Sequence, residues 1–272
     1  MNHHLLQINK IRLFDHSDIN HSSITHSFAL DDALCLSVSE TKETILRLWV
    51  HKPTVVFGIP DSRLPYFNEG IEYLIKEKYE VIIRNSGGLA VLLDEGILNL
   101  SFVFPDTNDI HQGYEAMVEF IKEIFKDETS EIEAYEITES YCPGSYDLSI
   151  GGKKFAGISQ RRVKNGSAVQ IYLCVEGDGS KRAELIRNFY QIAKKDEETK
   201  FKYPNVNPDV MASLEQLLQK RITVQDVIKL IVEKLRENGI TIYENTLNER
   251  EQQWYDQRIK LMNERNKSVN SL

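Results

Sequence analysis

Short apolar runs separated by turn residues fill the first two thirds of this 272-residue chain and constrain its fold more than any other feature. Runs of four to nine residues bounded by glycine, proline or asparagine are typical of strands. We expect strands at 45–50, 54–58, 80–84, 89–93, 98–104, 148–150, 153–158 and 167–175. The runs at 89–93 and 98–104 flank a turn at 94–96, which predicts a hairpin.

Helical spacing is the second pattern. Apolar residues recur at helical intervals in 67–78, 111–126 and 224–237, and most of the chain after residue 182 is helical in pattern. Strands therefore dominate the first two thirds and helices the last third. This order predicts an α+β fold with mixed or antiparallel sheets flanked by helices, and not a regularly alternating parallel sheet.

The two ends of the chain differ from its centre. Residues 1–39 are polar and rich in histidine before a helix begins near Ser27. We interpret these histidines as part of an exposed, weakly ordered arm and not as a metal site. Residues 247–271 are highly charged and predict a solvated helix that frays at its end. The sequence thus predicts an N-terminal extension at 1–39, one main domain at 40–245 and a charged helical tail at 246–272.

Composition and missing motifs exclude several classes of function. A formal net charge of −8 leaves no dominant basic face for nucleic acid. The N-terminus lacks the apolar region of a signal peptide, and no apolar run could span a membrane. Three cysteines without metal-ligand spacing predict free thiols in a reducing cytoplasm and no metal site. The chain has no phosphate loop, Gly-x-Ser-x-Gly elbow, His-Glu-x-x-His or Gly-x-Gly-x-x-Gly motif.

A thiol in a turn is the first candidate for chemistry. Cys142 is followed by Pro143 and Gly144, which favour a turn and an accessible sulfur. Two interpretations stay open for it, a nucleophile that reacts as thiolate or a small half-buried hydrophobe. Cys35 and Cys174 lie in apolar patterns and are expected in the core.

The basic pair Lys153-Lys154 follows this turn within the reach of one hairpin. Strand alternation sends the two side chains to opposite faces, so one of them can point inward while the other meets solvent. A second unusual stretch, Arg84-Asn-Ser-Gly-Gly-Leu-Ala-Val91, follows a predicted strand. Its centre is either an ordinary tight turn or a glycine turn that brings backbone close to a ligand.

Three motifs in order resemble the catalytic domain of lipoate- and biotin-protein ligases across residues 40–245. They are the stretch 84–91, then Asp94, Gly96, Leu98, Asn99 and Ser101, and finally Lys154-Phe-Ala-Gly157. The resemblance implies the fold of that catalytic domain. It also implies that substrate is bound by Arg84, Ser86, Gly87, Gly88, Ala156 and Gly157.

Within that superfamily, the stretch 141–150 with Lys154 and Ser159-Gln-Arg-Arg162 most resembles the family of octanoyl-[glycine cleavage H protein]:protein N-octanoyltransferases. This resemblance implies that Cys142 carries the acyl group as a thioester. It also implies that Lys154 lowers the pKa of that thiol and moves the protons. The chain has Leu93 where many ligases have a histidine, which argues against adenylate chemistry.

The resemblance further implies an exchange between two amides that needs no ATP and no cofactor. The donor would be an octanoylated lysine of the glycine cleavage H protein, and the acceptor a lysine on a lipoyl domain of a 2-oxoacid dehydrogenase complex; neither a nucleic acid nor a membrane takes part. Strands at 81–83 and 89–93 are expected to line the octanoyl slot.

Three other readings stay in view. An octanoyl-acyl carrier protein:protein octanoyltransferase would share Cys142 and Lys154. An ATP-dependent lipoate-protein ligase would not need the cysteine. A non-catalytic acyl-binding module would need neither residue.

Overall fold

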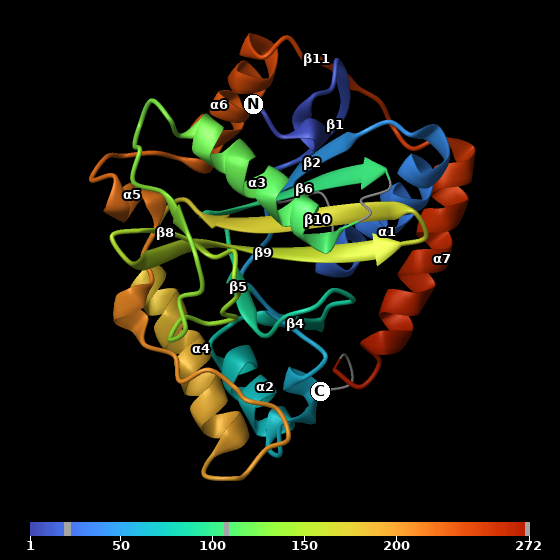
Figure 1. Cartoon of the computed structure of the whole chain (residues 1–272). Helices are drawn as coiled ribbons and strands as arrows, with labels where there is room; N and C mark the ends of the chain where they lie inside the picture. The colour runs from blue at the N-terminus through green and yellow to red at the C-terminus, as the bar shows by residue number, and fades with distance from the viewer. Residues whose placement is uncertain (19–22, 106–108, 270–272) are drawn as a thin grey trace.

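The computed structural model describes residues 1–18, 23–105 and 109–269, and its strands form two sheets (Figure 1). The larger sheet has the order β11-β1-β2-β6-β10-β9-β8-β7, and the smaller has the order β4-β3-β5. The larger sheet comprises β1 (Lys10–His16), β2 (Ile45–Trp49), β6 (Ile97–Pro105), β7 (Glu133–Ala134), β8 (Leu148–Ile150), β9 (Lys153–Val163), β10 (Gly166–Cys174) and β11 (Thr241–Glu244). The smaller sheet comprises β3 (Thr54–Phe57), β4 (Glu80–Ile83) and β5 (Val91–Leu93).

Helices flank these sheets, and the predicted α+β class is confirmed. They are α1 (Ile24–Thr41), α2 (Phe67–Lys76), α3 (Ile110–Ile124), α4 (Gly179–Lys194), α5 (Leu214–Leu217), α6 (Val224–Glu237) and α7 (Glu249–Arg265), with 3₁₀ turns at His4–Leu6, Asp61–Arg63 and Pro208–Val210. Strand pairing is mixed, because β6, β9 and β10 are antiparallel while β1 is parallel to both β2 and β11. Among the described helices, none is long and apolar enough to cross a membrane.

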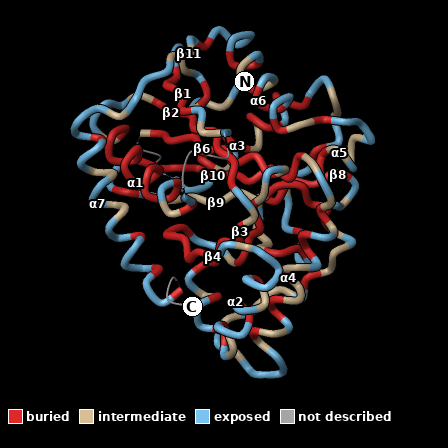
Figure 2. Tube along the Cα trace, turned by 180° about the vertical axis from the view of Figure 1, so that it is seen from behind, coloured by how far each residue is buried: buried red, intermediate tan, exposed pale blue. Residues whose placement is uncertain are grey.

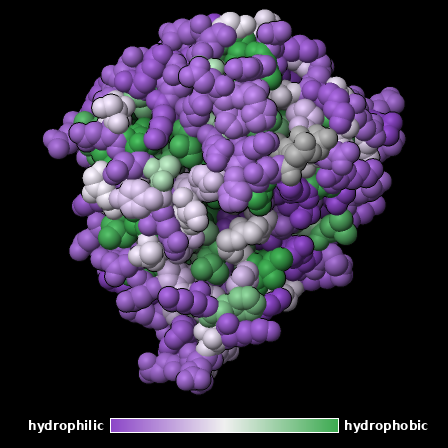
Figure 3. Space-filling model, viewed as in Figure 1, coloured by the Kyte–Doolittle hydropathy of each residue, from purple (hydrophilic) through white to green (hydrophobic). Residues whose placement is uncertain are grey.

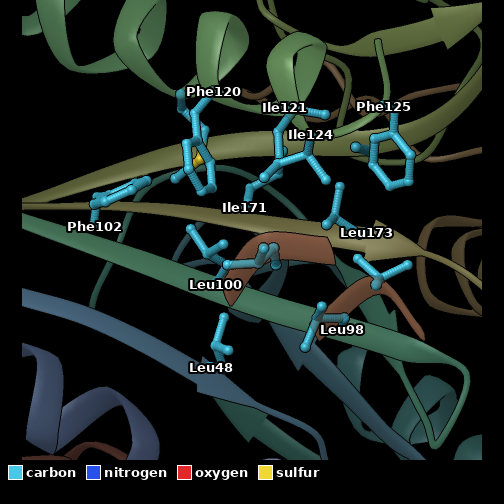
Figure 4. Close-up of a cluster of buried hydrophobic side chains, with 14 of the residues drawn as sticks. Leu48, Leu98, Leu100, Phe102, Phe120, Ile121, Ile124, Phe125, Ile171 and Leu173 are labelled. Carbon is cyan, nitrogen blue, oxygen red and sulfur yellow. The ribbon is translucent and has the colours of Figure 1, made fainter. Parts of the chain in front are cut away.

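The strand β10 is buried along its whole length at the centre of the large sheet, and its alternation explains the layers on either side. Ile171 and Leu173 point toward α3, whose apolar residues Phe120, Ile121 and Ile124 cover them (Figure 4). Each such buried side chain contributes about 1.5–3 kcal/mol. Ala168 lies on the opposite face of the strand and packs in the core that contains α1.

The smaller sheet forms a second core with α2 and α4 (Figure 1). Here the predicted hairpin is wrong, because β5 pairs with β3 while β6 pairs with β2 and β10. The turn between β5 and β6 carries the chain from one sheet to the other. Arg182 on α4 fixes this corner through two hydrogen bonds of 2.7 Å to the carboxylate of Asp94.

Both ends of the chain pack against the rest of the molecule. The predicted exposed arm is wrong for residues 11–14, which are buried in β1 because this strand inserts between β2 and β11. Residues 19–22 lie outside the described residues.

The charged tail forms α7 as predicted, but it is more than a solvated helix. Its outer side is exposed (Figure 2), whereas Glu251 is fully buried and binds Arg12 at 2.6 Å. Beyond α7, the side-chain amide of Asn266 hydrogen-bonds both the N–H and the C=O of Ile83 at the end of β4. Residues 270 and 271 of the predicted tail lie outside the described residues, and the boundaries after residues 39 and 245 stay a prediction.

The surface that faces the viewer in Figure 1 is mostly hydrophilic, with hydrophobic side chains in separate small groups (Figure 3). This agrees with a chain in which charged residues make up 27% and the apolar side chains are gathered into buried cores.

Candidate active site

A narrow cavity of about 50 Å³ lies between the two sheets and brings distant motifs together. Its walls come from α1, β2, β5, β6, β9 and β10 and from two loops, through Phe28, Trp49, Arg84, Val91, Leu93, Asn99, Cys142, Gly157, Ile158, Ser159, Gln170, Ile171 and Tyr172. The predicted lining by β5 is found at Val91 and Leu93. Residues 81–83 of β4, also predicted, are not among the lining residues.

Cys142 occupies a strained turn at this cavity. Its backbone φ is 45°, in the left-handed region that costs an L-residue about 1–2 kcal/mol. The side chain is half-buried, and its sulfur accepts a hydrogen bond from the backbone N–H of Leu89 at 3.1 Å. The Nη2 atom of Arg84 lies 3.6 Å from the same sulfur. The thiol is thus neither a core residue nor free in solvent.

The glycine turn after β4 lies against this sulfur. Gly88 has φ 99°, and a Cβ at this position would lie 2.8 Å from Cys142 Sγ and 2.4 Å from Arg84 Nη2. Gly87 has open space around it. Ser86 is buried, and its hydroxyl has no hydrogen-bond partner among the residues that the structure describes. The turn therefore packs closely against Arg84 and Cys142, and its approach to a ligand stays a prediction.

We expect Gly88→Ala to disrupt the thiol site because the added methyl needs the space that Arg84 and the sulfur occupy. The rate of reaction at the thiol should fall at least about tenfold, and stability by about 1–3 kcal/mol. Gly151→Ala is the matched control, since Gly151 also has a positive φ of 56° but nothing within 4 Å of its Cβ position. The control should lose some stability and keep the reactivity of its thiol. Equal rates for Gly88→Ala and the wild type would contradict the expectation.

Lys154 confirms the predicted alternation on β9. Its side chain is fully buried, whereas Lys153 is exposed. The ammonium group reaches the turn that carries the thiol, where it donates hydrogen bonds to the carbonyl oxygens of Cys142 at 2.9 Å and Tyr141 at 3.0 Å and to the Ser140 hydroxyl at 3.1 Å. The structure therefore brings Lys154 and Cys142 together, through the backbone of the cysteine.

Asp147 is the partner of Lys154 that sequence reasoning missed. Its Oδ1 lies 2.9 Å from Lys154 Nζ, and both side chains are buried. Its Oδ2 accepts the backbone N–H groups of Ile137 and Gly144, which ties down the loop around the thiol. Burial raises the pKa of Asp147, and the neighbouring ammonium opposes that rise. A carboxylate at the start of an otherwise apolar strand, within the stretch 141–150, was the available signal.

Gly157 and Ala156, both predicted to bind substrate, lie in different surroundings. Gly157 lines the cavity and leaves room for the ring of Tyr172, whereas Ala156 packs in the core beneath α3. Cys35 and Cys174 are buried as expected, and burial raises the pKa of Cys174 to about 11. Within the described ranges, no three His, Cys, Asp or Glu side chains are grouped so that they could hold a metal ion.

Comparison with known proteins identifies the family to which this chain is similar. The model of the lipoyl protein ligase A/B catalytic domain matches residues 23–236. A curated relative from Exiguobacterium sibiricum is 50% identical over 97% of this chain and 98% of its own length, and one from Oceanobacillus iheyensis is 54% identical over 89% and 88%. Both relatives carry the name octanoyl-[GcvH]:protein N-octanoyltransferase.

Solved structures show the same fold. Lipoate-protein ligase A bound with ATP has a TM-score of 0.69 at 19% identity, covering 93% of this chain and 94% of that one. A bipartite lipoate protein ligase from Thermoplasma acidophilum, described with its E2 lipoyl domain, has a TM-score of 0.67 at 20% identity over 93% and 92%.

The fold and the site therefore define a lipoyl protein ligase A/B catalytic domain, and the chain belongs to that family. Its curated relatives place it among the acyltransferases of the family, with the octanoyl-[GcvH]:protein N-octanoyltransferases. The resemblance inferred from the motifs is confirmed.

Proposed function

We propose that this chain moves an octanoyl group from a lysine of the glycine cleavage H protein to a lysine of lipoyl domains, through a thioester on Cys142. The name shared by the curated relatives supports the donor and the group transferred. The E2 lipoyl domain that accompanies the archaeal ligase supports the acceptor. The observation that carries the mechanism is one turn at the cavity, in which Cys142 presents its sulfur while Lys154 binds its carbonyl oxygen at 2.9 Å.

In the first half-reaction, the thiolate attacks the carbonyl carbon of the donor amide and a carbon–sulfur bond forms. The carbon–nitrogen bond then breaks, and the leaving amine must take up a proton. Lys154 is the proposed acid, because it is a buried ammonium group at the turn of the nucleophile. It becomes neutral as the amine of the donor lysine departs.

The second half-reaction repeats these steps in reverse, with the acceptor lysine in place of the donor lysine. The amine of the acceptor lysine attacks the thioester, Lys154 recovers its proton from that amine, and the thiolate leaves. One amide is broken and one is formed, so the exchange is close to neutral in free energy and needs no ATP. The free thiol on which both halves depend is maintained in a reducing compartment such as the cytoplasm.

The apolar walls of the cavity fit an acyl tail. Val91, Leu93 and Ile171 supply aliphatic surface, and each methylene buried there contributes about 0.8 kcal/mol. The tail thus anchors the substrate through the apolar surface between the two sheets.

The proposal is tested by mixing the protein with octanoylated H protein, without ATP, and measuring its intact mass. We expect an added octanoyl group that hydroxylamine removes and that a lipoyl domain then accepts. Octanoyl-acyl carrier protein is offered in a parallel reaction, and a preference for it would identify the related transferase. A requirement for ATP would identify a ligase and contradict the proposed exchange.

A further inference from the structure

Arg84 is a buried cation that, among the described residues, lacks the carboxylate partner which each of the other buried arginines has. Its side chain follows β4 and is 6% exposed. Its Nη2 contacts the carbonyl oxygen of Leu89 at 3.0 Å and the sulfur of Cys142 at 3.6 Å, while its Nε has no hydrogen-bond partner in the described part of the chain. Among the residues that the structure describes, no carboxylate lies within ion-pair distance of this guanidinium. The other buried arginines each have one, in the pairs Arg12–Glu251, Arg47–Asp31 and Arg182–Asp94.

Asp61 is the acidic group near Arg84, and it is a poor counter-ion. Its carboxyl group already accepts hydrogen bonds of 2.8 Å from the Tyr190 hydroxyl and the Gly58 N–H. Burial raises the pKa of Asp61 to about 7, although these hydrogen bonds and Arg84 oppose the rise. Burial thus favours the neutral form of this carboxyl group, which weakens it as a counter-ion. A buried cation without a full counter-ion is costly, and an anion beside it removes that cost.

Lys154 is differently placed. Its ammonium group is matched by Asp147 at 2.9 Å, and its other contacts are a hydroxyl and two carbonyl oxygens. The positive charge of Lys154 is thus balanced mainly by partners within the loop. At the sulfur itself, the donors that converge are the Leu89 N–H at 3.1 Å and Arg84 Nη2 at 3.6 Å.

Building on the proposed function, we infer that Arg84, together with the backbone amide of Leu89, holds Cys142 as a thiolate and receives that thiolate again when it leaves the thioester. Arg84 is then a catalytic residue in contact with the reacting sulfur, and not only a substrate-binding residue as its motif implies. Lys154 transfers protons to and from the lysine amines and positions the turn. The two cations of the site divide the two tasks.

The test is the rate at which iodoacetamide alkylates Cys142 as a function of pH, followed on the Cys142 peptide by mass spectrometry. Arg84→Gln should slow alkylation at pH 7 by about tenfold or more, because a cation within about 4–6 Å of an acidic group favours its charged form. Arg84→Lys keeps the charge and should stay within about threefold of the wild type. Replacing both members of the other pair, in Lys154→Met with Asp147→Asn, should move the profile less than Arg84→Gln does.

Cys35 and Cys174 report on folding in the same experiment, since both are buried and should stay unreactive. If they react in Arg84→Gln, then Arg84→Met, which keeps an apolar stem, replaces it. An unchanged profile in the folded neutral variant, or a larger change in the Lys154 pair variant, would overturn the inference. Failure of the wild-type protein to form an octanoyl adduct on Cys142 would instead refute the proposed function and leave the alkylation result standing.

Discussion

Cys142→Ser is expected to abolish octanoyl transfer, with a loss of about 10⁴-fold or more. A serine hydroxyl fits the same turn and can accept the same N–H of Leu89. It does not ionise near neutral pH, however, so Arg84 has no anion to hold and no acyl intermediate accumulates. The measurement is transfer from octanoylated H protein to a lipoyl domain, together with the intact mass of the enzyme.

Two kinds of control make this expectation specific. Cys35→Ala removes another thiol, which lies on α1 and is buried in the core, and should keep transfer within a few-fold of the wild type. Cys142→Gly should be more stable than Cys142→Ala by about 1 kcal/mol, because glycine tolerates the φ of 45°. Substantial transfer by the serine variant without ATP would contradict the thioester route.

Lys154→Met should destabilise the fold by about 3–5 kcal/mol and abolish transfer. Removing the ammonium leaves the Asp147 carboxylate buried without a counter-ion, which is the costly way to break such a pair. The pH dependence has a definite sign. Asp147 already has a raised pKa in the folded state, and losing Lys154 raises that pKa further. The folded variant then binds a proton that the unfolded chain has released, so its stability falls as pH rises above the unfolded pKa.

Urea unfolding at acidic and neutral pH measures this effect. The matched variant is Lys154→Met with Asp147→Asn, which removes both charges and should recover most of the stability without recovering transfer. Recovery of both stability and transfer would show that Lys154 acts only as a structural cation. A stability of Lys154→Met equal to that of the wild type would show that the pair contributes nothing to the fold.

Local patterns predict much of this molecule. The periodicity of 224–237 gives the observed bounds of α6, and strand alternation correctly turns Lys154 inward and Lys153 outward. These features depend on neighbours in sequence, which set side-chain direction within one element. The motifs likewise place Cys142 and Arg84 at one site.

The sequence patterns do not predict contacts between segments that are far apart in the chain. Nothing local in β5 and β6 shows that the turn between them joins two different sheets, because the corner is fixed by Arg182 on α4. Arg84 and the sulfur of Cys142 are 58 residues apart, and their contact depends on the positive φ of Gly88. The strand β1 is not predicted, because its polar and histidine-containing sequence becomes a strand only through pairing with β2 and with β11 near the other end of the chain.

The hydrogen bonds between Asn266 and Ile83 have a consequence for how the enzyme is made. Ile83 directly precedes Arg84, and the side chain that fixes its backbone is synthesised 183 residues later. Chains fold from their N-terminal parts while synthesis continues, so both sheets can form before this clamp exists. A chain interrupted before residue 266 would lack these two hydrogen bonds to Ile83. The backbone that leads into Arg84 is thus fixed by a side chain far along the chain, and not by its own sheet alone.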